Sequence, residues 1–91
     1  MRIEIIRIEP IVKIKIQREH GLTSEEVERT FEEGEPIFNR VGGGQHRGIG
    51  KIDRYITVFF VYNEKRKQAT IKTAYLSDEK QIRYYKKTRG S

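Results

Sequence analysis

The clearest pattern of apolar and polar residues in this 91-residue chain lies between positions 52 and 75. β-Branched and aromatic side chains fill nearly every position of Tyr55–Tyr62, which is typical of a strand with a pleated, half-buried surface. The polar run Asn63–Lys67 predicts a turn and Gln68–Tyr75 a second strand, so the two strands form a hairpin. Because the first strand is apolar on both faces, we expect it at the centre of a sheet, covered on both sides.

Two further strands and one helix follow from the pattern in the first half of the chain. Arg2–Glu9 alternates between apolar and charged residues, which predicts an edge strand with a charged outer face. Leu22–Gly34 predicts a short helix, because Thr23 and Glu26 have the spacing of a capping box. Pro36–Val41 reads as another strand.

The segment Ile11–His20 fits two structures. Its alternating branched residues are typical of a strand, whereas Pro10 before it and Gly21 after it are typical of the start and end of a helix. The residues themselves leave both alternatives open.

The stretch Gly42–Gly50 contains five glycines in nine residues and predicts a loop. It lacks the spacing of a phosphate-binding P-loop or of a dinucleotide motif. The simpler interpretation is a flexible hairpin connection. The alternative is a basic loop that folds over a phosphate backbone through its amides and Arg47.

The chain is predicted to end in a helix that starts at the N-cap Ser77 and continues over 79–87, with Ile82 and Tyr85 facing the sheet. Without a linker or repeat, residues 1–91 form one predicted domain. No apolar run is long enough to span a membrane, and no signal peptide is recognisable. We therefore expect a cytoplasmic protein, and the lack of cysteine is compatible with a reducing compartment.

Charge divides the chain into two halves. Residues 1–39 contain six Lys/Arg and nine Asp/Glu, whereas residues 40–91 contain thirteen Lys/Arg and four Asp/Glu. A basic half on a small domain favours a polyanionic partner such as nucleic acid, although it is equally compatible with a solubilising surface.

The segment Glu19–Val27, with the letters EHGLTSEEV, resembles the "KHGVxxEEV" segment of BrnT-type toxins of type II toxin–antitoxin systems. The similarity continues through Phe31, the His46–Arg47 pair, Val58–Tyr62 and Ile71–Tyr75 to the closing helix. It covers most of residues 18–86. In that family the segment before the HG pair is usually helical, which favours a helix over residues 10–20.

The resemblance implies an α+β fold, RelE-like, with a small antiparallel sheet flanked by two or three helices. It implies a metal-independent endoribonuclease without a cofactor, whose partners are RNA and a cognate antitoxin, often with a ribbon-helix-helix part. Two departures matter. Tyr75 stands where the family has an arginine, and Lys80-Gln81-Ile82 or its neighbours replace the Glu-Arg-Arg of the family's last helix.

Metal-independent RNA cleavage requires a base, an acid and cations that stabilise the phosphorane. Histidine is suited to proton transfer near neutrality and arginine to bidentate contact with phosphate. The predicted catalytic residues are His20, His46, Arg47, Lys72, Tyr75 and Arg83. The predicted nucleic-acid-binding residues are Arg40, Arg54, Lys65, Arg66, Lys67, Tyr84 and Lys86.

Two structural constraints apply to these candidates. His20 has a simpler role available, contact with the last carbonyls of a helix. Lys72 and Tyr75 lie on opposite faces of a regular strand, so they share a face only if a bulge intervenes. The acidic run over residues 25–35 has no recognisable metal-ligand geometry and is interpreted as a solvated helix face.

The sequence predicts an RNA-cleaving toxin. The alternatives are a non-catalytic nucleic-acid-binding module and an interaction protein that uses the basic half of the chain.

Overall fold

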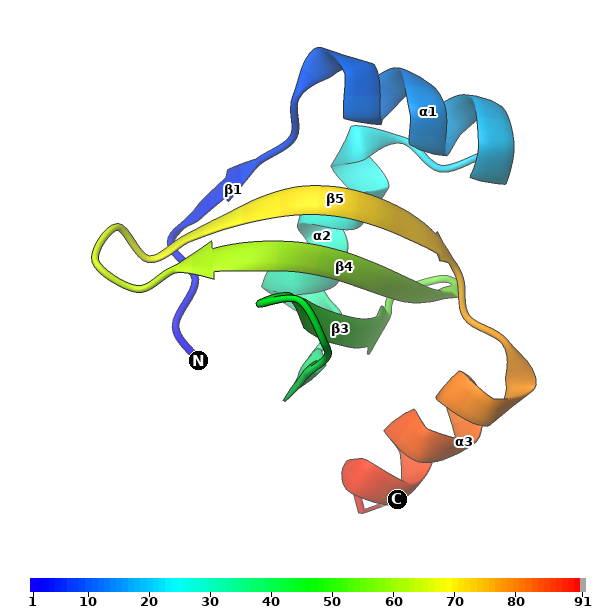
Figure 1. Cartoon of the computed structure of the whole chain (residues 1–91). Coiled ribbons are helices and arrows are strands. Elements are labelled where there is room, and N and C mark those ends of the chain that lie inside the picture. Colours follow the sequence, from blue (N-terminus) through cyan, green and yellow to red (C-terminus); the bar gives the residue numbers. More distant parts are fainter. Residues whose placement is uncertain (91) are drawn as a thin grey trace.

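The computed structural model describes residues 1–90, which form a five-stranded sheet and three helices (Figure 1). The strands are β1 (Ile5–Arg7), β2 (Ile37–Arg40), β3 (His46–Lys51), β4 (Tyr55–Asn63) and β5 (Gln68–Leu76). The helices are α1 (Pro10–His20), α2 (Ser24–Glu33) and α3 (Glu79–Thr88).

The strand order is β1-β5-β4-β3-β2, which places β4 at the centre as its apolar pattern predicts. β2 to β5 are connected as antiparallel neighbours, whereas β1 pairs with β5 in parallel. The α+β class is confirmed, but the sheet is mixed and not purely antiparallel. β1 lies beside a strand from the other end of the chain, so no tight turn sets its direction.

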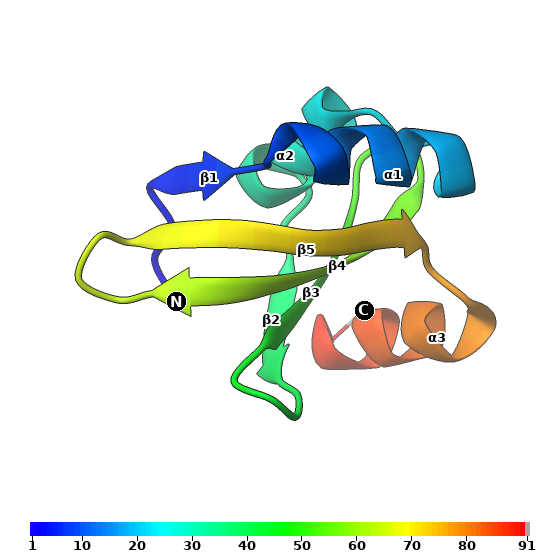
Figure 2. The same cartoon turned by 45° about the horizontal axis from the view of Figure 1, so that its top comes forward.

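Helices α1 and α2 cover one face of the sheet, and α3 lies on the opposite side (Figure 2). The core between the sheet and the first two helices contains nine buried apolar residues: Ile16, Leu22, Val27, Ile56, Val58, Phe60, Ala69, Ile71 and Ala74. α3 covers only part of the other face, so β4 is not covered on both sides along its whole length. Val61 remains 38% exposed there.

Residues 10–20, for which the sequence left strand and helix open, form helix α1, because the residues at both ends favour a helix. Pro10 occupies the first turn, and Gly21 takes the left-handed conformation with φ 65°. The Gly21 N–H donates to the Gln17 carbonyl at 3.0 Å, and the Leu22 N–H donates to the Ile16 carbonyl at 3.3 Å. Within α1 only Ile16 is fully buried, and Ile11 and Ile14 stay exposed. The signals at both ends of the helix, together with its contacts with β5, therefore outweigh the weak strand pattern.

The capping box predicted at the start of α2 is present, with Thr23 and Glu26 each accepting a hydrogen bond from the other's backbone N–H. The prediction for α3 was wrong by one residue. Its N-cap is Asp78 and not Ser77, because Asp78 forms a second capping box with Gln81.

Only the first part of the glycine-rich stretch 42–50 forms a loop. Residues from His46 onward form β3, and the prediction of a loop up to Gly50 was wrong. A methyl group on Gly50 would approach Thr30 Cγ2 of α2 to 2.9 Å, and one on Gly48 would approach the Phe38 ring to 3.1 Å. Gly50 therefore allows β3 to pack closely against α2, and Gly48 leaves room for the Phe38 ring, so neither glycine marks flexibility.

Candidate nucleic-acid interface

A β-bulge in β5 decides which side chains share the exposed face of the sheet. Phe59 pairs with Thr73 and Phe60 pairs with Ile71, so Lys72 has no partner on β4. Ile71 and Ala74 are both buried in the core beneath α1 and α2. In a regular strand one residue separates two core positions, but here both Lys72 and Thr73 lie between the core residues Ile71 and Ala74. Lys72 and Thr73 therefore belong to the face opposite the core, and so does Tyr75.

We call this surface the open face. It is the part of the sheet, on the side away from α1 and α2, that α3 leaves uncovered. Its residues include Asn39, Arg47, Phe59, Val61, Lys72, Thr73 and Tyr75. Asn39, Arg47, Phe59 and Thr73 are successive cross-strand partners, so they form one continuous row over β2, β3, β4 and β5.

Arg47 is fixed at one end of this row. Its Nε donates a hydrogen bond to Asn39 Oδ1 at 3.1 Å, and its guanidinium carbon lies 5.3 Å from the centroid of the Tyr84 ring on α3. Both contacts leave the terminal nitrogens of the guanidinium without a carboxylate partner among the ion pairs of residues 1–90. Arg47 is therefore an oriented cation with donors available for a phosphate group.

Aromatic rings continue the site across the sheet. Phe59 and Tyr75 are stacked with their centroids 6.0 Å apart, and the His20 ring at the end of α1 lies 5.8 Å from that of Tyr75. Half-exposed aromatic faces beside a cation are the usual surface on which single-stranded bases stack. The carbonyls of Gln17 and Ile16 at the end of α1 accept from the backbone N–H groups of Gly21 and Leu22, and His20 Nε2 lies 3.9 Å from Glu19 Oε1.

The Tyr75 hydroxyl is held from beneath by Gln81. Gln81 Nε2 donates to the Tyr75 hydroxyl at 2.9 Å, and Gln81 Oε1 accepts from Thr57 Oγ1 at 3.1 Å and from the Asp78 N–H at 2.9 Å. With its acceptor role filled, the Tyr75 hydroxyl retains its own proton for donation. Sequence analysis missed Gln81, although its spacing from Asp78 is the capping-box signal.

The other predicted residues lie elsewhere. His46 and Arg40 pair across β3 and β2, and the alternation along β3 puts them on the face opposite Arg47. Arg54 is bound to Glu26 on α2 at 2.5 Å, and its hydrogen bond is the main cause that lowers the pKa of that carboxylate.

The remaining basic residues are distributed around the molecule. Lys65, Arg66 and Lys67 form the turn between β4 and β5, and Arg83 is exposed on α3. Lys86 Nζ lies 5.9 Å above the Tyr55 ring. Of the predicted basic residues, Arg47 and Lys72 are the two that the strand register places on the open face.

Among residues 1–90, no group of three or more His, Cys, Asp or Glu side chains could hold a metal ion. In the same part of the chain, no helix is long and apolar enough to cross a membrane.

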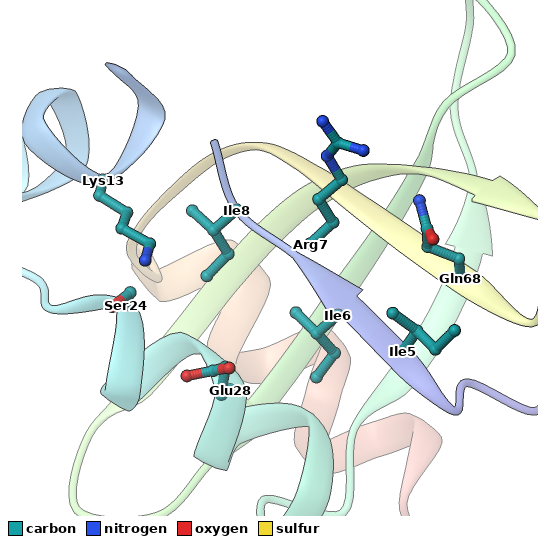
Figure 3. Close-up of a pocket in the computed structure, with 8 residues that line it drawn as sticks. All are labelled: Ile5, Ile6, Arg7, Ile8, Lys13, Ser24, Glu28 and Gln68. Atoms are coloured by element: carbon teal, nitrogen blue, oxygen red, sulfur yellow. The ribbon is translucent and has the colours of Figure 1, made fainter. Parts of the chain in front are cut away.

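A separate hollow of about 330 Å³ lies between β1, α1 and α2 (Figure 3). Its lining combines the apolar side chains of Ile6 and Ile8 with Arg7, Lys13 and Glu28. None of the residues predicted for catalysis or nucleic-acid binding lines it.

Fold and surface together define a small α+β protein with a five-stranded mixed sheet, one face covered by two helices and the other partly open. A solved structure of this class that the chain is similar to is the ribonuclease toxin BrnT of Brucella abortus. The match has a TM-score of 0.66 and covers 84% of this chain and 100% of that chain, at 11% sequence identity. At this identity the likeness establishes the fold, and it confirms the BrnT-type fold that the sequence predicted.

No protein-family model matches the sequence. No curated protein matches it either.

Proposed function

We propose that this protein is a metal-independent endoribonuclease, the toxin of a type II toxin–antitoxin pair. The observation that carries the proposal is Arg47, an oriented arginine with no carboxylate partner among residues 1–90, in a row of half-exposed residues on the open face. The fold shared with a ribonuclease toxin supports the same activity. The proposal includes a cognate antitoxin partner and action on RNA in the cytoplasm.

In the proposed reaction, the 2′-hydroxyl of the RNA attacks the adjacent phosphorus and the 5′-oxygen leaves. Arg47 binds a non-bridging oxygen of the phosphate, and Lys72 adds a second positive charge from the bulge. Phe59 and Tyr84 stack on flanking bases. These contacts orient the phosphate in the open face.

His20 and Tyr75 supply the proton transfers. Their rings lie 5.8 Å apart, and the Tyr75 hydroxyl is held by Gln81 with its proton free. His20 takes the proton of the 2′-hydroxyl as that oxygen bonds to phosphorus, and Tyr75 gives its proton to the 5′-oxygen as the P–O5′ bond breaks. Exchange with solvent then returns both residues to their starting protonation states. His46 and Arg83 have no part in this chemistry.

The second candidate is a non-catalytic RNA-binding module. Tyr75 favours it, because a neutral phenol stands where the resembling family has an arginine. A face with stacking rings and one anchored arginine is sufficient to bind a single strand without cleaving it.

The test compares Arg47→Ala with Arg66→Ala in the full chain, incubated with single-stranded RNA in the presence of a chelator. Arg66 is the matched control because it is an exposed arginine at the β4–β5 turn, far from the open face. We expect cleavage to fall about 100-fold in Arg47→Ala and to stay near the wild-type rate in Arg66→Ala. Lys72→Ala is expected to lower the cleavage rate less than Arg47→Ala does.

Saturable RNA binding without cleavage by the wild-type protein would refute the enzyme and favour the binding module. Equal loss in Arg47→Ala and Arg66→Ala would show that only bulk charge matters. Failure to retard RNA at low salt, where phosphate contacts are strongest, would rule out both candidates.

A further inference from the structure

A second feature, on the face of the sheet away from Arg47, has the composition of an anion site. A pocket of about 270 Å³ lies at the end of the β2–β3 hairpin and is lined by Arg40, Val41, Gly44, Gln45 and His46. Arg40 and His46 are direct cross-strand partners, so their side chains leave the same face of the sheet. The lining contains no carboxylate.

Arg40 carries an uncompensated charge. Its side chain takes part in none of the ion pairs formed by residues 1–90. An arginine without an acidic partner at the rim of a pocket keeps its planar set of donors available for a bidentate contact with an oxyanion.

The His46 ring, on the cross-strand partner of Arg40, packs against two aromatic rings. The imidazole stacks on Phe60 with centroids 5.6 Å apart and 21° between the planes, and it contacts the Tyr62 ring edge-on at 6.3 Å. Its Nδ1 is buried and has no hydrogen-bond partner. We assign the ring proton to Nε2, because a buried N–H without an acceptor is rarer than a buried acceptor without a donor. His46 then presents a single donor.

The loop that closes the pocket exposes further donors. The Val41 N–H bonds to the Gln45 carbonyl at 3.0 Å, which closes the turn. Gly43 and Gly44 have φ of 72° and 71°, and a Cβ on either would meet no atom within 4 Å. Successive backbone amides in such a turn form a concave surface that binds anions. The two glycines are thus required by backbone conformation and leave room for a ligand.

We propose that this pocket binds a terminal phosphate group, held by the Arg40 guanidinium, the His46 Nε2–H and the loop amides. The volume lies just below that of pockets for drug-sized ligands, which fits a phosphate group better than a whole nucleotide. The site is independent of the open face and of the proposed cleavage, since it requires neither Arg47 nor an RNA chain.

The first experiment titrates inorganic phosphate into the full chain and follows the His46 imidazole signals by NMR, with calorimetry for the affinity. We expect saturable binding in the wild type, at least tenfold weaker binding in Arg40→Gln, and unchanged binding in the control Arg66→Gln. His46→Phe retains an aromatic ring against Phe60 but removes the donor, so its binding is also expected to weaken.

Arg40 is exposed, so Arg40→Gln is expected to leave the fold intact, which circular dichroism verifies. Linear, non-saturating shifts in the wild type, or equal affinity in wild type and Arg40→Gln, would overturn the proposal. The result is separate from the ribonuclease test, because phosphate binding is measured without RNA.

A second arm identifies the source of the phosphate. It compares oligonucleotides of one sequence that differ only in a 5′-phosphate or a 5′-hydroxyl. Tighter binding of the phosphorylated strand that disappears in Arg40→Gln assigns the pocket to RNA ends. Equal binding of both strands, with inorganic phosphate still bound, assigns it to a free phosphate.

Discussion

Gln81 links the fold to the candidate site, and replacing it tests that link. In Gln81→Met an apolar side chain of similar length takes its place. The change removes three hydrogen bonds, to the Tyr75 hydroxyl, from Thr57 and from the Asp78 N–H. Gln81 is only 9% exposed, so water does not readily replace these partners.

The expected loss follows from the count of these bonds. Each hydrogen bond contributes about 0.5–1.5 kcal/mol net, so three of them amount to about 1.5–4.5 kcal/mol. Thr57 retains its bond to Ser77 at 2.6 Å, which limits its own loss. A small domain has roughly 5–15 kcal/mol of stability in total, so this change is a substantial part of it.

The assay is urea unfolding followed by circular dichroism. Gln81→Glu is the paired variant, because its carboxylate keeps the two acceptor contacts and loses only the donor to Tyr75. We expect Gln81→Glu to lose less stability than Gln81→Met. RNA cleavage, by contrast, should fall in both variants, since the Tyr75 hydroxyl loses its donor in each. A loss below about 0.5 kcal/mol in Gln81→Met would refute the reasoning.

Three further predictions concern the scaffold. Gly50→Ala should cost about 1–3 kcal/mol in thermal or urea unfolding, because its methyl group meets Thr30 at 2.9 Å; an unchanged midpoint would contradict this close packing. Tyr85→Phe should cost about 1–3 kcal/mol, because the buried hydroxyl donates to backbone carbonyls after α2 at 3.0 Å; a neutral result would show that water replaces it. Glu26→Gln keeps the capping box but removes the ion pair with Arg54, so it should cost under about 1 kcal/mol at pH 7. The Arg54 hydrogen bond lowers the pKa of Glu26 in the folded state, so this stabilisation is fully present above the ordinary pKa of 4.5 and is lost as the pH falls below the folded-state pKa. If the difference in unfolding free energy between wild type and Glu26→Gln stayed the same at about pH 2 to 3, the ion-pair account would be contradicted.

Local signals in the sequence were sufficient for most of the elements. The branched and aromatic run of β4 predicted its central position, and Thr23 with Glu26 predicted the start of α2. Both signals act within a few residues, as a pattern of burial or as a reciprocal hydrogen bond, so they can be recognised without the rest of the chain. The charge division of the chain was likewise visible, but not the faces on which the cations lie.

The sequence by itself determined the α+β class, strands β2, β4 and β5 and the capping box of α2, whereas it missed β3 and placed the N-cap of α3 one residue too early. The tertiary structure alone decided which side chains share a surface. The bulge at Lys72 reverses the alternation of β5 and brings that lysine to the face of Tyr75. β3 separates His46 from Arg47, although they are neighbours in the chain. The physical reason is that the pairing register is set by contacts between distant segments, and a shift of one residue moves a side chain to the other face.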